Sequence, residues 1–311
     1  MKKIFLSILV TLIFSINGFS QNLAYLDDQK LTEFTNKLAK LPFSERDVIL
    51  KACDIFNADF ANNPDLADWA FQILYYYHEI SCEDKTATLH KTFADEEIRG
   101  YYLKDIEISP KLRNDISDFS KEYAKWGYRI ASFEDTSYCM EVDSNFLYTK
   151  FEKLLSRDYS YYFGNFVSDL GVPPYWHATL NMSIGEIMRR IEWRDNFLDK
   201  NPEFIRNDLV IREIEYLMFS IAKGLENTPI YDDKDVILPH YKDAIQSYYR
   251  TYPNTKWGLF LTEFMHRLSL NKYRNSNPID QFVLENLFPK NRKNIDPLLK
   301  YKDILIDNLM D

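Results

Sequence analysis

Glycine is scarce in this sequence, with only 8 glycines among 311 residues. All-β folds need glycine at many tight turns, so this scarcity argues against a sandwich or a barrel. The chain also has no Gly/Ser-rich linker, no phosphate-binding glycine loop, no GxGxxG fingerprint and no GxSxG nucleophile elbow. The sequence signatures of nucleotide-binding enzymes and of α/β-hydrolases are therefore missing.

Positive charge is also in short supply. The sequence has 38 Lys and Arg residues against 47 Asp and Glu residues, which gives a formal net charge of −9 at pH 7. An acidic surface repels the phosphates of nucleic acids and the headgroups of anionic lipids. We therefore expect no nucleic-acid partner.

Cysteine is rare, and the three thiols belong to Cys53, Cys82 and Cys139. In an oxidising compartment they permit at most one disulfide, with one thiol left over. A chain of this length needs no covalent cross-link to fold, so we expect three small, buried apolar side chains. One disulfide among them is the open alternative.

One long hydrophobic run is present, and it lies at the start of the sequence. A basic start at Met1–Lys3 precedes an apolar run over Ile4–Ile16 and a small polar exit over 17–20. This is the three-part pattern of a secretory signal peptide cleaved after Ser20. The run is shorter than the roughly 20 apolar residues of a membrane span, although an uncleaved anchor is the alternative. We expect a periplasmic or secreted protein that begins near Gln21, without stable membrane insertion after cleavage.

Apolar residues recur at helical spacing along most of the chain. Residues 28–80 are expected to form three packed helices, with Asp27 or Asp28 capping the first and a capping box of Ser44 and Asp47 before the second. The clearest helix covers 110–126, where one apolar stripe runs down one face. Further helices are predicted at 144–156, 183–199, 204–225, 239–252, 255–270 and 296–309.

A small β-hairpin is predicted near 128–142. Two aromatic and β-branched segments flank the polar turn Glu134–Ser137. The competing interpretation continues the preceding helix through Phe133, because Ile130 and Phe133 extend its apolar stripe. We prefer the hairpin because the turn is polar, so the predicted fold class is mainly α with one small hairpin.

Two segments, Trp193–Phe204 and Ile245–Trp257, share a helix–turn–helix pattern. Each ends a helix on large apolar residues, turns at a proline and places an aromatic residue in the next helix. These segments resemble the inter-repeat turns of irregular tetratricopeptide-like proteins in bacterial envelopes. The second half of the chain is similar to a family of uncharacterised exported bacterial helical proteins. The resemblance implies an irregular α-helical repeat array that is α-solenoid-like, and it implies no known activity.

We expect a boundary between two regions of the chain near 157–180. Two prolines in Gly171–Pro174 predict a loop within this range. We therefore expect a signal peptide over 1–20 and an N-terminal helical region with the hairpin over 21–156. A C-terminal tetratricopeptide-like region is expected over 157–311.

Two residue pairs have the spacing of metal ligands. His78 and Cys82 would share one helix face at i, i+4, and Glu263 and His266 stand at i, i+3. Neither pair has the further ligands that a metal centre requires, so both fit ordinary helix faces. We expect no metal, no cofactor and no catalytic residues.

The strongest candidate binding site is the loop in which Tyr175, Trp176 and His177 follow two prolines. Rigid aromatic side chains lose little entropy when they bind a partner, and histidine titrates near neutral pH. Neighbours in an extended loop point to alternate sides, so we expect Tyr175 and His177 to face outward. Trp176 either binds a ligand or fills the core.

The predicted function is that of an exported α-helical scaffold that binds a protein or peptide in the bacterial envelope without catalysis. Paired helices, an acidic surface and the lack of a catalytic set favour it. The alternative is a hydrolase of envelope or polysaccharide material with an aromatic-lined cleft around His177. Convergence of His177 with two carboxylates in a deep pocket would favour the hydrolase.

Overall fold

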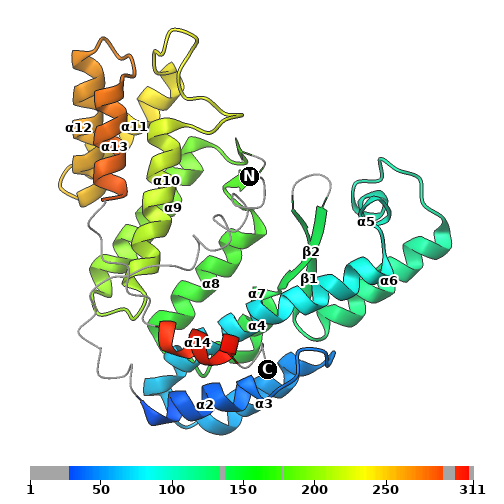
Figure 1. Cartoon of the computed structure of the whole chain (residues 1–311). Coiled ribbons are helices and arrows are strands. Elements are labelled where there is room, and N and C mark those ends of the chain that lie inside the picture. The colour runs from blue at the N-terminus through cyan, green and yellow to red at the C-terminus, as the bar shows by residue number, and fades with distance from the viewer. Residues whose placement is uncertain (1–27, 134–136, 177, 290–297, 308–311) are drawn as a thin grey trace. The chain divides into compact units, whose positions relative to one another are not determined.

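The computed structural model describes residues 28–133, 137–176, 178–289 and 298–307 (Figure 1). The predicted signal peptide, residues 1–20, and its cleavage site lie outside these ranges. Within them the protein is mainly helical, with two small antiparallel sheets of two strands each, which confirms the predicted fold class. The described residues form two compact units: an N-terminal unit of 28–168 with 298–307, and a C-terminal unit of 169–289.

Helices and one hairpin build the N-terminal unit, and its last helix comes from the end of the chain. Its helices are α2 (Gln29–Ala39), α3 (Val48–Phe60), α4 (Pro64–Thr92), α5 (Asp95–Tyr102), α6 (Pro110–Ala124), α7 (Ser144–Phe151), the first part of α8 (Arg157–Gly171), and α14 (Leu299–Asp307). The first three match the three helices predicted over 28–80. Helix α14 packs on α2 and α4, so its contacts group it with this unit.

The ends of α2 and α3 are stabilised in different ways. Asp28 caps α2 as predicted, and its Oδ1 accepts a hydrogen bond from the backbone N–H of Lys30 at 2.7 Å. The predicted capping box before α3 is wrong, because the Asp47 side chain makes no capping hydrogen bond. Its carboxylate lies 3.6 Å from the ammonium of Lys51 instead. The buried ammonium of Lys85 in α4 holds the turn before α3 by donating to the Glu45 carbonyl at 2.9 Å.

An aromatic cluster fills the core of the N-terminal unit. Phe71 of α4 lies at its centre and is fully buried. Its ring contacts those of Phe56, Phe151, Tyr159 and Phe163 mainly edge to face, with centroid distances between 4.9 and 6.4 Å. Edge-to-face pairs of this kind stabilise the folded state beyond the burial of area alone. The core thus ties α3, α4, α7 and α8 together.

The predicted hairpin is confirmed. Strands β1 (Tyr128–Phe133) and β2 (Ser137–Val142) pair antiparallel, with Tyr128 opposite Val142. The competing continuous helix is wrong, because α6 ends at Ala124 and Gly127 adopts a φ of 81°. A Cβ atom at Gly127 would also lie 2.6 Å from the Phe146 ring, so glycine is required there for two reasons. Residues 134–136 of the turn lie outside the described part.

The C-terminal unit consists of helices and a very short second hairpin. Its elements are the end of α8, then β3 (Tyr175–Trp176), β4 (Thr179–Leu180), α9 (Ile184–Lys200), α10 (Asn207–Lys223), α11 (Pro239–Thr251), α12 (Lys256–Leu270) and α13 (Asn277–Leu287). Helices α9 and α10 pack together, as do α11 and α12, and α11 also packs on α9. Helix α13 packs on both α10 and α12. Two helix pairs are present, and the longer repeat array stays a prediction.

Each of the two proline turns joins the two helices of one pair, and an aromatic residue packs near each turn. After Pro202 the ring of Phe204 meets that of Phe197 at 4.9 Å, edge to face. After Pro253 the buried ring of Trp257 enters the core of the unit. Gly258 allows the turn to pass close to α12, because a Cβ atom there would lie 1.8 Å from the Tyr252 carbonyl oxygen. The expected aromatic residue in the next helix is present in the second segment, where Trp257 belongs to α12, whereas Phe204 lies in the turn before α10.

Candidate binding surface on α5 and α6

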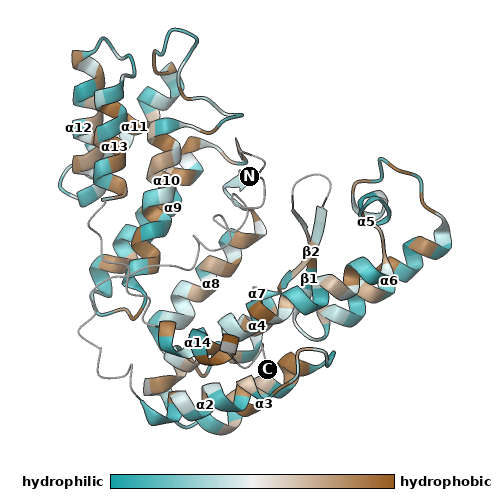
Figure 2. Cartoon of the chain, viewed as in Figure 1, coloured by the Kyte–Doolittle hydropathy of each residue, from teal (hydrophilic) through white to brown (hydrophobic). Residues whose placement is uncertain are grey.

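The segment that joins α5 to α6 carries large apolar side chains at the surface. Tyr102 is 42% exposed, Leu103 is 54% exposed and Ile106 is 36% exposed. Figure 2 shows hydrophobic stretches along this connecting segment. Single exposed apolar residues are ordinary, whereas a cluster of them often marks an interaction site. Core packing does not explain why these three side chains are exposed.

The local backbone explains how the segment comes to lie over α5. Gly100 allows it to fold back, because a Cβ atom there would lie 2.7 Å from Ile108 and 2.8 Å from the Ile106 carbonyl oxygen. Asp105 forms an ion pair with Arg99, with 2.7 Å between its Oδ2 and the Nε atom. Ser109 then caps α6, accepting a hydrogen bond from the Leu112 N–H. Helix α5 packs on α6 and β2, which fixes the segment to the unit (Figure 1).

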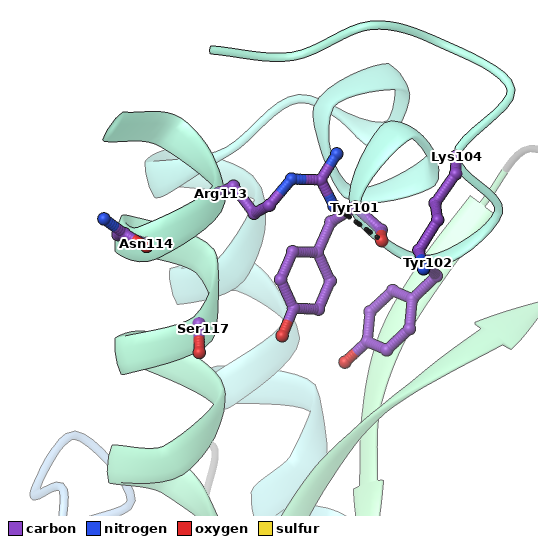
Figure 3. Close-up of a pocket in the computed structure, with 6 residues that line it drawn as sticks. All are labelled: Tyr101, Tyr102, Lys104, Arg113, Asn114 and Ser117. Carbon is purple, nitrogen blue, oxygen red and sulfur yellow. Dashed lines mark hydrogen bonds between the residues drawn. The ribbon is translucent and has the colours of Figure 1, made fainter. Parts of the chain in front are cut away.

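An open concavity of about 540 Å³ lies at this segment, and Tyr102 is one of its lining residues (Figure 3). Its lining residues come from the end of α5, from the turn after it and from α6: Tyr101, Tyr102, Lys104, Arg113, Asn114 and Ser117. The two tyrosine rings are nearly perpendicular, with centroids 4.9 Å apart, and point to the same side. The concavity therefore combines aromatic faces, two cations and small polar groups.

The cations of the concavity are available to a ligand. Arg113 lies over the Tyr101 ring and donates a hydrogen bond to the Tyr101 carbonyl oxygen at 3.4 Å. Neither Arg113 nor Lys104 forms an ion pair with a carboxylate of the described residues. Tyr102 stacks on Tyr138 of β2, and partial burial raises the pKa of its phenol. The lining is positive within a chain whose net charge is negative.

We name Tyr101, Tyr102, Leu103, Lys104, Ile106 and Arg113 together the α5–α6 surface. The sequence did not predict it as a site. The available signal was two adjacent tyrosines followed by aliphatic residues between charges, just before the helix start at Ser109 and Pro110. Apolar residues in a connecting segment are unusual, but the sequence alone does not reveal whether they turn inward.

The loop that the sequence favoured as a site is anchored to the C-terminal unit. Tyr175 packs against the core of that unit, and its hydroxyl lies 3.4 Å from Ser220 Oγ. Burial raises the pKa of Tyr175 to about 12. The expectation that Tyr175 faces outward is therefore wrong, because the hairpin of β3 and β4 turns its ring inward. The side chain of Trp176 and the whole of His177 lie outside the described residues, so their binding roles stay predictions.

Carboxylates near this loop are engaged by arginines. Arg194 lies between Asp169 and Glu213, with 2.7 Å from its Nη2 to Asp169 Oδ2 and 2.7 Å from its Nε to Glu213 Oε2. Arg190 also contacts Asp169, and its Nη2 donates to the Val172 carbonyl at 2.8 Å. These contacts hold the end of α8 and the loop against α9. These ion pairs have a structural role. Both carboxylates of the network are paired with arginine, so neither is a candidate general acid or base.

The two candidate metal pairs have local partners. His78 is fully buried, and the Cys82 thiol donates to the His78 carbonyl oxygen at 3.3 Å. Glu263 forms an ion pair with Arg267 at 2.7 Å. Across the described residues, no group of three or more His, Cys, Asp or Glu side chains could hold a metal ion.

The three cysteines are free thiols. Cys53 and Cys82 are buried as expected, whereas Cys139 is half-buried. Burial raises the pKa of Cys53 and of Cys139 to about 12. Thiols with a raised pKa are poor nucleophiles, so none of these residues is a candidate catalytic cysteine.

Comparison with protein families, curated proteins and solved structures found no match to this chain. Among the described helices, none combines the length and apolar character that crossing a bilayer requires. The chemistry of the α5–α6 surface and the sequence are therefore the features from which a function can be inferred.

Proposed function

We propose that this protein is an exported, non-catalytic α-helical binding protein of the bacterial envelope, and that it binds a protein or peptide through the α5–α6 surface. The supporting observations are the exposed apolar side chains of Tyr102, Leu103 and Ile106 in one short segment and the open concavity that Tyr102 lines. The basic start and apolar run of the sequence support export.

The kind of side chain at this surface favours a protein partner. Leu103 and Ile106 are aliphatic, and they are stabilised on binding only if apolar groups of the partner cover them. Tyr102 offers an aromatic face of the kind that is enriched at the centres of protein interfaces. The positive lining adds orientation and a faster encounter rate to this apolar contact.

A pull-down from envelope extract with quantitative mass spectrometry tests the binding role. Bait proteins should be the mature chain and its Leu103→Ser variant, with Leu270→Ser as the matched control, since Leu270 is 73% exposed but lies in the C-terminal unit. We expect Leu103→Ser to lose a partner that the wild type and Leu270→Ser retain. Equal recovery with all three baits would refute the assignment to this surface.

Export is tested separately by mass spectrometry of the protein recovered from its own cell envelope. We expect an N-terminus near Gln21, because the apolar run ends at Ile16 and a small polar exit follows. Intact Met1 on most of the material would contradict cleavage.

A further inference from the structure

We infer that the segment received by the α5–α6 surface is acidic and amphipathic, with a carboxylate beside an apolar or aromatic side chain. This inference rests on the proposed function and specifies the chemistry of the partner. The carboxylate would meet Lys104 and Arg113, and the apolar side chain would cover Leu103, Ile106 and the ring of Tyr102.

Charge complementarity at the concavity favours an acidic partner. The whole chain carries a net charge of −9, yet both charged residues that line the concavity, Lys104 and Arg113, are cations. The connecting segment has two acids of its own, Asp105 and Glu107, and Asp105 is engaged by Arg99. A carboxylate from a partner would therefore neutralise charge here, whereas a basic segment would leave two cations facing it.

The position of Arg113 favours a carboxylate as the ligand group. Its guanidinium carbon lies 6.0 Å from the centroid of the Tyr101 ring, and Nη1 already donates to the Tyr101 carbonyl oxygen. These two contacts hold a planar group that retains further N–H donors (Figure 3). A guanidinium held in this way is suited to a carboxylate, which can accept two parallel hydrogen bonds.

The exposed aliphatic side chains of Leu103 and Ile106 favour a peptide over an acidic polysaccharide. Leu103 and Ile106 directly flank Lys104 and Asp105 in the sequence, so apolar and charged contacts would be only a few ångströms apart along a ligand chain. A peptide can place a carboxylate and an apolar side chain at that spacing. A uronic-acid polymer supplies the carboxylate but has no aliphatic side chain to cover Leu103 and Ile106.

Fluorescence anisotropy with defined probes tests this inference on the mature full-length chain. The probe is a fluorescein-labelled peptide of Glu-Phe pairs separated by Gly-Ser spacers. Its controls replace each Glu by Gln, or each Phe by Ser, and polygalacturonate serves as the acidic polysaccharide. We expect the Glu-Phe peptide to bind about tenfold more tightly than either control peptide, and this preference to weaken at high salt.

Protein variants assign the binding to the surface. Lys104 and Lys272 are both exposed lysines with positive φ, at 60° and 56°, but Lys272 lies in the C-terminal unit. Lys104→Gly should weaken Glu-Phe binding about tenfold, and Lys272→Gly should leave it unchanged. Arg113→Gln should have an effect similar to Lys104→Gly, with a partial recovery in Arg113→Lys.

Each outcome bears on one claim. Equal binding of the Glu-Phe and Gln-Phe peptides, or equal effects of the two lysine variants, would overturn the acidic partner. Tighter binding of polygalacturonate than of any peptide would overturn it in favour of a polysaccharide. If the pull-down loses its partner in Leu103→Ser while the Glu-Phe preference fails, the proposed function stands and only the acidic partner is wrong. If the Glu-Phe preference holds without any envelope partner, the surface chemistry stands and the proposed function fails.

Discussion

Arg113 and Tyr101 contact each other twice: the guanidinium lies over the tyrosine ring and also donates to the tyrosine carbonyl oxygen. The first contact joins a side chain to a side chain, and the second joins α6 to the backbone at the end of α5. Together they fix a cation beside exposed apolar residues in an acidic protein. The proposed binding role of the α5–α6 surface depends on this arrangement.

Glycine at position 104 should stabilise the fold. Lys104 adopts a φ of 60° directly after the last turn of α5, in the left-handed region that favours glycine. We expect Lys104→Gly to raise the free energy of unfolding by up to about 1 kcal/mol, measured by urea denaturation. Lys272→Gly, at a φ of 56°, should have a similar effect. A loss of stability in both variants would show that backbone conformation does not govern these sites.

Acid should destabilise the N-terminal unit through His78. Its imidazole is fully buried, packs edge to face on Tyr128 at 4.7 Å, and has no hydrogen-bond partner at either ring nitrogen among the described residues. Burial lowers the pKa of His78 to about 3 from an ordinary 6.5. The folded state thus favours the neutral ring. The contribution of the neutral His78 ring to the free energy of unfolding is therefore complete above pH 6.5 and falls as the pH drops towards 3.

The measurement is urea denaturation at pH 7 and at pH 4.5. At pH 4.5 the loss attributable to His78 should be about 2–3 kcal/mol. His78→Leu should remove that part of the pH dependence, whereas the control His266→Leu should not, because His266 is exposed. An unchanged pH dependence in His78→Leu would show that the ring is not held neutral by burial.

Alanine substitutions at Gly258 and Gly171 should have very different effects on the free energy of unfolding. A Cβ atom at Gly258 would lie 1.8 Å from the Tyr252 carbonyl oxygen, and backbone cannot move aside as a side chain can. We expect Gly258→Ala to cost about 3 kcal/mol or more of unfolding free energy. Gly171, the last residue of α8, has no atom within 4 Å of such a Cβ, so Gly171→Ala should change stability by less than about 0.5 kcal/mol. Similar thermal midpoints for the two variants would contradict the close approach at Gly258.

The sequence predicted elements where local signals agreed with one another. Pro110 and an apolar stripe defined α6, and the polar turn between aromatic segments defined the hairpin of β1 and β2. Helix α13, over Asn277–Leu287, was not predicted, although Pro278 stands in its first turn. The boundary between the two units, at Ser168 and Asp169, falls inside the seam expected near 157–180, but the segment there is helical through Gly171 because aromatic residues of α8 pack into the core around Phe71. Such long-range packing has no local sequence signature.

Candidate sites were harder to predict than helices. Whether a tyrosine is a ligand platform or a core residue depends on what packs over it, as Tyr175 and Tyr102 show. Tyr175 follows two prolines and was expected outward, yet it packs against the core. Tyr102 is the last residue of α5 and is 42% exposed, although Gly100 lets the next segment fold back over this helix. Both outcomes depend on contacts between residues that neighbouring sequence does not specify.

Photo-cross-linking in living cells tests directly whether the α5–α6 surface binds a protein partner. A benzophenone amino acid replaces Leu103 in one strain and Leu270 in another, so that both probes are exposed at the start. We expect a discrete higher-mass adduct from position 103 and none from position 270. Adducts of the same mass and yield from both positions, or none from position 103, would contradict binding at this surface.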